Sequence, residues 1–300
     1  MKSRFYGVYT ALLTPFDERG EIDERKLRRL VNFLLSKKIN GFYLCGGAGE
    51  GIFMDVEERK RVAEIVQDEV KEKAKIIVHV GTYNTKNAVE LARHAERIDV
   101  DAISSLPPLY YYYSEEEVLN YYREVADSTT LPFFLYYIPA TTRVVLTSEK
   151  IVQLGKIKNI MGLKYTHSDF YLLQEMLLRM EGRWIAFSGA DELFLPALTM
   201  GVIGSIGSTQ NVLPEIFVDI YEKFKQGRIQ EAMELQKRIT TAVSLLKCRH
   251  TGLVSWKTAL KFRGIDAGHC RAPLRKKFSP DEEKELLKRW KYYFPEFVEV

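Results

Sequence analysis

Short apolar segments alternate with amphipathic segments eight times along the first 226 residues, and this rhythm restricts the fold more than any other feature of the chain. Each apolar segment has the composition of a buried parallel strand, and each following segment has the periodicity of a helix with one apolar face. Eight such units predict an α/β protein with a (β/α)8 TIM barrel rather than an open sheet. The predicted strands span residues 6–13, 41–47, 74–81, 101–108, 132–139, 159–165, 183–191 and 201–209.

Capping residues indicate where several of the intervening helices begin. Asp23, Asp55 and Ser114 each precede an amphipathic segment and can accept hydrogen bonds from the first free N–H groups of a helix. Two acidic residues follow Ser114, where they suit the positive end of the helix dipole. Four further helices are predicted. One spans residues 85–97, one begins at Ser148, one follows Ser168 and one spans residues 213–226.

The last part of the chain has a different pattern. From Ile229 onward only helical patterns occur, and no linker rich in Pro or Ser precedes them. We therefore predict that residues 1–226 form the barrel and that residues 227–300 form a C-terminal α-helical extension. This extension is expected to pack on the barrel, so that the chain is a single structural unit.

Composition and charge exclude several classes of function. The formal net charge is only +4 for 300 residues and no basic cluster is present, so nucleic-acid binding is not expected. No apolar run suits a signal peptide or a membrane span, so we expect no membrane association. The few cysteines and histidines lack ligand spacing, which predicts a reduced cytoplasmic setting and no metal ion. They are Cys45, Cys248, Cys270, His79, His94, His167, His250 and His269.

The active site of a barrel of this type lies where the strands end at their carboxyl side. This rule brings five segments to one mouth and makes their side chains candidates for function. The candidates are Lys164, Tyr136 and Tyr137 at strand ends, and the segments 46–50, 189–192 and 205–208 directly after or within other strand ends.

Lys164 is the most informative of these residues. It follows Ile160, Met161 and Leu163 in an apolar strand, and lysine is almost never fully buried without a partner. Burial in apolar surroundings lowers the pKa of a lysine, and the neutral amine can then form a Schiff base with a ketone. An ion pair with Asp191 or Glu192 is the structural alternative, and the sequence leaves it open.

Tyr136 strengthens the catalytic interpretation. Schiff-base chemistry needs a group that moves protons between the carbinolamine, the substrate hydroxyl and water, and a phenol close to the amine can do so. A tyrosine that only packs its ring is the alternative in a chain with 17 tyrosines. Because Tyr136 ends the strand next to that of Lys164, the two residues together favour catalysis.

Six motifs also carry a resemblance to a known family. They are GGAGEG at Gly46, LPPLYYYYS before residue 115, LYYIPATT at Leu135, GLKYT at Gly162, GADELF at Gly189 and GSIGST at Gly204. In their order and spacing the chain resembles, over nearly its whole length, the class I pyruvate-dependent aldolases that include N-acetylneuraminate lyase and dihydrodipicolinate synthase. As a set, these motifs are highly specific for that family.

The resemblance implies a role for each matching residue. Lys164 would form the Schiff base with the keto carbon of pyruvate or of a 2-keto-3-deoxy acid, so that no separate cofactor is needed. Tyr136 would be the general acid and base, and Tyr110 would reach into the site of a neighbouring subunit. The implied assembly is a homotetramer built as a dimer of dimers, and the implied partner is a small keto acid or sugar acid.

Within the family, the chain is most similar to the N-acetylneuraminate lyase branch. Dihydrodipicolinate synthases carry an arginine two residues after the proline of the strand-five motif, but here Pro139 is followed by Ala140 and Thr141. Arg143 lies two places later, and a guanidinium fork shifted in this way would not present the same geometry. The positions that the resemblance assigns to substrate binding are Gly47, Ala48, Thr166, Gly189, Asp191, Glu192, Ile206 and Ser208.

One motif departs from the family pattern. Relatives usually carry two hydroxyl residues after the first glycine of the strand-two motif, where this chain has Gly47 and Ala48. Backbone N–H groups of the turn, or a water molecule, would then have to hold the substrate carboxylate. The preferred function is an N-acetylneuraminate lyase. The alternatives are an aldolase or dehydratase for another acid such as 2-keto-3-deoxygluconate, a dihydrodipicolinate synthase, and last a non-catalytic sugar-acid-binding protein.

Overall fold

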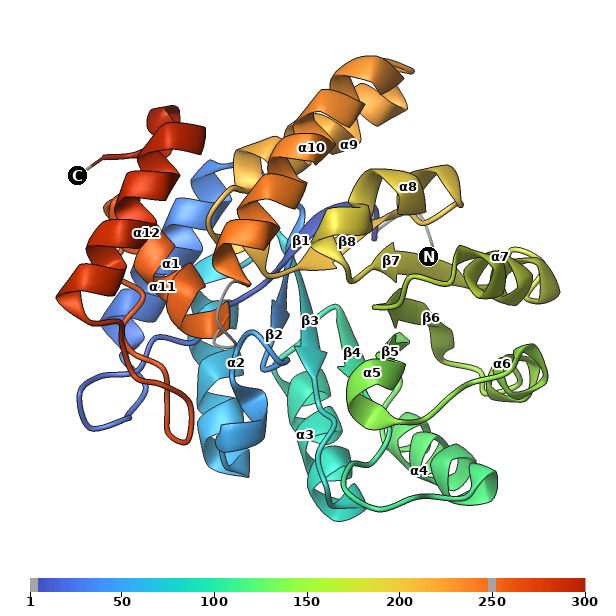
Figure 1. The fold of residues 1–300 in the computed structure, drawn as a ribbon. Helices are drawn as coiled ribbons and strands as arrows, with labels where there is room; N and C mark the ends of the chain where they lie inside the picture. The colour runs from blue at the N-terminus through green and yellow to red at the C-terminus, as the bar shows by residue number, and fades with distance from the viewer. Residues whose placement is uncertain (1–4, 248–251, 300) are drawn as a thin grey trace.

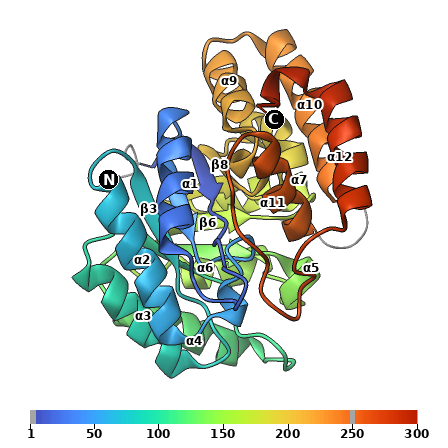
Figure 2. The same cartoon turned by 90° about the vertical axis from the view of Figure 1, so that its left-hand side faces the viewer.

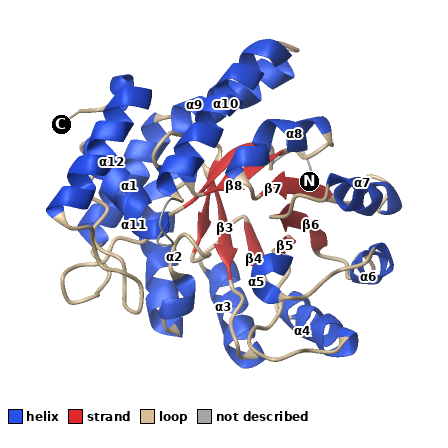
Figure 3. Ribbon diagram, viewed as in Figure 1, coloured by secondary structure: helices blue, strands red, loops and turns tan. Residues whose placement is uncertain are grey.

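Eight parallel strands form a closed barrel at the centre of the molecule (Figures 1 and 3). The computed structural model describes residues 5–247 and 252–299, and Cys248 and His250 lie outside them. Each strand pairs with the next in parallel, and β8 closes the ring on β1. The predicted TIM barrel is therefore confirmed. The strands are β1 (Gly7–Ala11), β2 (Gly41–Leu44), β3 (Lys75–His79), β4 (Ala102–Ser105), β5 (Phe133–Tyr137), β6 (Ile160–Tyr165), β7 (Ile185–Ser188) and β8 (Gly204–Gly207).

The helices between the strands surround the barrel (Figure 3). The predicted caps are confirmed, since Asp23, Asp55 and Ser114 each accept a hydrogen bond from an N–H group in the first turn of the following helix. The helices that belong to the barrel are α1 (Glu24–Ser36), α2 (Val56–Val70), α3 (Thr85–Arg97), α4 (Glu115–Asp127), α5 (Pro139–Thr142), α6 (Ser148–Leu154), α7 (Phe170–Arg179), α8 (Phe194–Thr199) and α9 (Pro214–Lys225).

Several short elements at the mouth were not predicted. The helix α5 directly follows β5, and short 3-10 helices occur at η2 (Gly51–Phe53), η3 (Asp191–Leu193) and η4 (Thr209–Asn211). Elements of three or four residues span about one turn, which is too short for an apolar periodicity to develop. Pro139 at the first position of α5 is the one local signal of a helix start.

Side chains inside the barrel come from alternate residues of the strands, because successive residues of a strand point to opposite faces. Inward side chains of β2, β5 and β7 make part of this inner layer aromatic, and they include Tyr43, Tyr136 and Phe187. A larger apolar core lies between the outer face of the barrel and the helices. The buried apolar residues of this cluster are Phe5, just before β1, and Tyr9, Ala11, Tyr43, Ile77, Ala102, Phe134, Tyr136, Ile185, Phe187 and Ile206.

Three helices follow the barrel and lie together on one side of it (Figure 2). They are α10 (Ile229–Leu246), α11 (Gly252–Phe262) and α12 (Pro280–Tyr293), and the short η5 (Pro295–Phe297) follows them. The predicted C-terminal helical extension is thus present, and the strand-to-strand rhythm ends before it. Among the helices of residues 5–247 and 252–299, none combines the length and apolar character that crossing a membrane requires.

Candidate active site

Lys164 and Tyr136 lie side by side at the mouth of the barrel. They are direct partners in the register of β5 and β6, so both side chains project from the same level of the sheet. The Lys164 Nζ atom lies 4.1 Å from the centre of the Tyr136 ring. The sequence-based expectation that these two residues meet is borne out by this geometry.

Lys164 is buried without a carboxylate partner. Only 4% of the residue is exposed, and its amino group makes no hydrogen bond or ion pair with any residue that the structure describes. The alternative of an ion pair with Asp191 or Glu192 is therefore not realised. Burial lowers the pKa of Lys164 to about 7, and the Asp191 carboxylate opposes this change only from a distance. A substantial share of the amine is thus neutral near pH 7.

Tyr136 keeps its proton under the same conditions. Burial raises the pKa of Tyr136 to about 12, while Thr166 close to the phenol opposes the rise. Thr166 Oγ1 is itself buried and makes no hydrogen bond of good geometry. A Cβ atom built on Gly189 would lie 1.9 Å from Thr166 Oγ1 and 3.2 Å from Lys164 Cε, so only glycine fits there. Gly189 thus provides space for both side chains.

Tyr43 forms a second aromatic wall beside the lysine, and sequence reasoning missed it. The Lys164 Nζ atom lies 4.3 Å from the centre of the Tyr43 ring, and the Tyr43 hydroxyl donates to Ser104 Oγ at 3.0 Å. Two ring faces so close to one amino group exclude water from it. The sequence did contain a signal, because alternate residues of a barrel strand face the interior and Tyr43 is one of them.

His79, at the end of β3, is a further missed residue of this wall. Its ring centre lies 6.0 Å from those of both Tyr43 and Tyr136. Burial, followed by the positive charges of Arg59 and Lys164, holds the pKa of His79 well below its usual value. A neutral imidazole adds no positive charge beside Lys164.

The glycine turn after β2 has free backbone donors. Glu50 N donates to Gly47 O at 3.1 Å and Gly51 N donates to Gly46 O at 3.1 Å, which closes the turn. The N–H groups of Gly47 and Ala48 donate to no acceptor within the described part of the chain. Successive free N–H groups in a turn are a common way to bind an anion.

The turn also contacts the tyrosine ring that lies beside Lys164, and it borders open space. A Cβ atom built on Gly46 would lie 2.6 Å from Tyr43 Cε1, so the turn rests on the same ring that covers Lys164. A Cβ atom built on Gly47 would meet nothing within 4 Å. A cavity of about 580 Å³ is lined by Gly46, Gly47 and His79, among other residues.

On the opposite side of the mouth, polar atoms lack partners. Asp191 Oδ2 accepts from Thr209 N at 2.8 Å and from Ser208 Oγ at 3.4 Å, whereas Asp191 Oδ1 is buried without a hydrogen bond. Burial raises the pKa of Asp191 above its ordinary value. Asp191 therefore fastens the turn after β8 instead of capping its own helix. Buried polar atoms without partners are rare and suit a site that a ligand completes.

Glu192, Ile206 and Tyr110 differ in their surroundings. Glu192 Oε1 pairs with Lys247 Nζ at 2.7 Å, while Glu192 Oε2 has no hydrogen bond. Ile206 lies inside the barrel in the same apolar layer as Tyr136. Tyr110 is 84% exposed and does not contact Lys164 within this chain.

Arg143 is placed away from the lysine. Its Nη1 atom donates to the Tyr112 hydroxyl at 3.0 Å, and its guanidinium lies 5.8 Å from the centre of that exposed ring. The structure therefore gives Arg143 a surface partner. No group of three or more His, Cys, Asp or Glu side chains suited to a metal ion occurs within residues 5–247 and 252–299.

Comparisons with known proteins agree with the motifs. The sequence profile described as the Dihydrodipicolinate synthetase family matches residues 4–291. N-acetylneuraminate lyase from Clostridium perfringens (strain SM101) is 36% identical over 288 residues, which make up 95% of this chain and 99% of that protein. This similarity extends over all eight strand–helix units.

Two solved structures show that the fold is equally similar at different levels of sequence identity. The structure of CdNal from Clostridium difficile in complex with mannosamine is 35% identical, covers 98% of this chain and 99% of its own, and has a TM-score of 0.92. Dihydrodipicolinate synthase from Aquifex aeolicus has the same TM-score of 0.92 at 26% identity, covering 99% of this chain and 100% of its own. Because the backbones match equally well, side chains at the mouth have to distinguish the possible substrates.

Proposed function

This chain belongs to the dihydrodipicolinate synthetase family, and we propose that it reversibly cleaves a 2-keto-3-deoxy sugar acid to pyruvate and an aldehyde. The best candidate reaction converts N-acetylneuraminate to N-acetylmannosamine and pyruvate. The observation that carries the proposal is the buried Lys164 amine, whose pKa is about 7, beside Tyr136. The enzyme is then a carbon–carbon lyase of the class I aldolase type.

The chemistry begins at the Lys164 amine. The amine attacks C2 of the keto acid, the carbinolamine loses water after Tyr136 donates a proton to the departing hydroxyl, and a protonated imine forms. The Tyr136 phenolate then takes the proton of the C4 hydroxyl while the C3–C4 bond breaks. The electron pair of that bond moves into the imine and gives an enamine, and the aldehyde leaves. Protonation of C3 and hydrolysis release pyruvate and restore Lys164.

Substrate binding is assigned to the two sides of the mouth. The free N–H groups of Gly47 and Ala48 would hold the carboxylate of the keto acid, in place of the hydroxyl groups that relatives usually carry there. Thr166, Asp191 and Glu192 each offer a buried oxygen without a partner, and such oxygens suit the hydroxyl groups of a sugar chain. Gly189, Ile206 and Ser208 complete the proposed set.

The surface supports an assembly of several copies. Tyr110, Tyr111 and Tyr112 are 84%, 71% and 85% exposed, and large adjoining apolar groups on a surface mark interaction sites. Tyr110 also has a φ of +88°, a strained value for a tyrosine, which favours a position that its surroundings fix. We assign Tyr110 to the site of a neighbouring copy in a homotetramer, and we place the enzyme in the cytoplasm. The covalent imine with Lys164 makes a separate cofactor unnecessary.

The first experiment tests the covalent step. The protein is incubated with pyruvate and sodium borohydride, and its intact mass and the modified peptide are measured. We expect a stable adduct on Lys164, and the variant Lys164→Met is the matched control. A folded wild-type protein without an adduct would contradict the proposal and would favour a non-catalytic sugar-acid-binding protein.

The second experiment identifies the sugar. Pyruvate release is measured with N-acetylneuraminate and with 2-keto-3-deoxygluconate, and pyruvate consumption is measured with the substrates of dihydrodipicolinate synthase. We expect N-acetylneuraminate to give the highest kcat/KM. The open space beside Gly47 is the observation that favours 2-keto-3-deoxygluconate or a related acid as the second candidate, by aldol cleavage or dehydration.

A further inference from the structure

Glu50 ends the glycine turn in a conformation that needs support. Its φ is +56°, which is uncommon for a residue with a side chain, and its side chain is completely buried. A buried carboxylate is costly unless it is paired and hydrogen-bonded. Glu50 is two residues from Ala48, so whatever fixes its side chain also restricts the turn.

The partner of Glu50 comes from the C-terminal extension. Lys257, on α11, places its Nζ atom 2.7 Å from Glu50 Oε1, and only 3% of the Lys257 side chain is exposed. Lys257 Nζ also donates to Thr14 O at 2.7 Å and to His269 O at 2.5 Å. One ammonium group thus joins the turn, the loop after β1 and the loop after α11.

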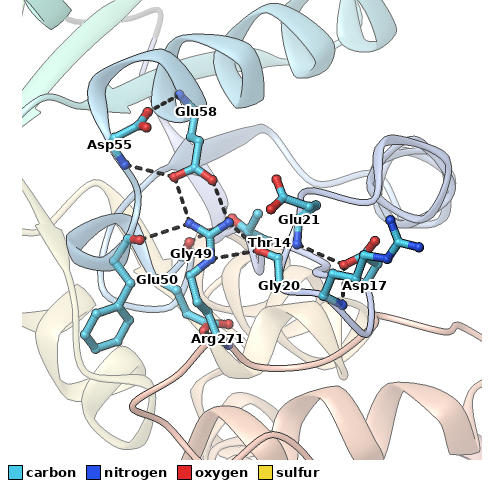
Figure 4. Close-up of polar contacts among 11 residues, drawn as sticks. Thr14, Asp17, Gly20, Glu21, Gly49, Glu50, Asp55, Glu58 and Arg271 are labelled. Atoms are coloured by element: carbon cyan, nitrogen blue, oxygen red, sulfur yellow. Dashed lines mark hydrogen bonds and ion pairs between the residues drawn. The ribbon is translucent and has the colours of Figure 1, made fainter.

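Thr14 and Arg271 add two further hydrogen bonds to the turn 46–50. The Thr14 hydroxyl donates to Gly49 O at 2.7 Å, and the backbone N of Arg271 donates to Glu50 Oε2 at 2.7 Å. Figure 4 shows the Arg271 guanidinium turned away from Glu50 and toward Glu58 at the start of α2. Arg271 Nη1 donates to Glu58 Oε2 at 2.8 Å and to Phe53 O at 3.0 Å, just after the turn.

From these contacts we infer that Lys257 is a positioning residue for the keto-acid carboxylate. Its ion pair with Glu50 holds the turn 46–50 so that the N–H groups of Gly47 and Ala48 face one ligand. Without Lys257, the Glu50 charge would be unpaired close to the substrate carboxylate, and the turn would lose its link to the extension. This inference rests on the proposed function, because it gives the turn the role of binding the carboxylate.

Borohydride trapping at increasing pyruvate concentrations separates binding from chemistry. We expect Lys257→Met to raise the half-saturating pyruvate concentration by about 10- to 100-fold, the loss corresponding to a hydrogen bond with a charged group. At saturating pyruvate, Lys164 should still be labelled completely. A residue with only a structural role would lower the melting temperature and leave the half-saturating concentration of the folded protein unchanged.

Two further variants complete the test, a control lysine substitution and a conservative substitution of Glu50. Lys261→Met changes a lysine one turn later on α11, whose partner Glu283 is 3.3 Å away in a partly exposed pair, and it should stay within twofold of wild type. Glu50→Asp keeps both charges and shortens the carboxylate by one methylene, so it decides the question if Lys257→Met does not fold. We expect a several-fold rise in the half-saturating concentration.

The outcomes distinguish this inference from the proposed function. If wild type forms no adduct, the proposed function fails and the inference fails with it. If wild type is labelled on Lys164 but folded Lys257→Met and Glu50→Asp both keep the wild-type half-saturating concentration, only the role of Lys257 is overturned.

Discussion

Two lysines of this chain are almost equally buried, and their surroundings are opposite. Lys164 and Lys257 are 4% and 3% exposed. Lys257 contacts one carboxylate and two carbonyl oxygens, so polar groups of the protein replace its water. The Lys164 amino group lies over two aromatic rings and has no hydrogen-bond partner within the described residues. Burial alone therefore does not make a lysine reactive.

The comparison shows how the surroundings of a buried lysine determine whether its amino group is charged or neutral. Acceptors that saturate an ammonium group stabilise it, and the residue then becomes a structural cross-link. Burial beside aromatic faces removes water and supplies no acceptor for the N–H groups. The ring faces attract a cation only weakly, so at Lys164 desolvation prevails, the neutral form is favoured and the amine becomes a nucleophile. The two lysines make this comparison testable within one protein.

The largest expected effect follows from replacing Lys164. Lys164→Met should abolish turnover, because no other amine occupies the place of the imine. It should also raise the melting temperature at neutral pH, because a cation without a partner is removed from the interior. Steady-state kinetics and thermal unfolding measure both. Wild-type activity in the variant would refute the mechanism.

Replacing the other lysine should have the opposite effect on stability. Lys257→Met should cost about 3–5 kcal/mol of unfolding free energy, since it leaves the Glu50 carboxylate buried and unpaired. Urea denaturation measures this loss, and Lys261→Met should cost less than about 1 kcal/mol. Equal losses in both variants would mean that the pair with Glu50 is no stronger than a surface pair.

The pH dependence should follow the Lys164 amine. Its pKa is about 7 in the folded protein against an ordinary value of 10.5, so imine formation should fall about tenfold for each pH unit below 7. The same shift makes the buried ammonium destabilising below pH 7, and this cost disappears as the pH rises toward 10.5. Trapping rates at saturating pyruvate from pH 5 to about 9 test the first statement. A flat profile would contradict a lowered pKa.

The smallest expected effect concerns the glycine turn. Gly47→Ser places a hydroxyl where a Cβ meets nothing within 4 Å and where φ is not positive, so the residue should fit. We expect pyruvate to inhibit up to about tenfold more strongly, through one added hydrogen bond to its carboxylate. Inhibition constants measure the change. An unchanged constant would mean that the N–H groups of the turn already satisfy the carboxylate.

Sequence periodicity was enough to predict the barrel and the meeting of Lys164 with Tyr136. Both residues end neighbouring strands, and parallel strands of a barrel bring such ends together. Periodicity could not predict the contacts among Glu50, Lys257 and Arg271, because the partners of Glu50 lie 207 and 221 residues away in the sequence. Contacts at such separations depend on how the extension packs. The division at residues 226 and 227 and the roles of the site residues stay predictions.

The contacts of Lys257 and Arg271 with Glu50 also have a consequence for the synthesis of the enzyme. The turn leaves the ribosome 221 residues before Arg271 does. At about 5–20 residues per second, the wait is about 10–45 s. During that time the barrel strands can pair, but the turn lacks Lys257 and Arg271. A nascent chain that already contains all eight strands would therefore bind keto acids weakly until Lys257 and Arg271 are synthesised, and the enzyme would gain its full affinity only late in translation.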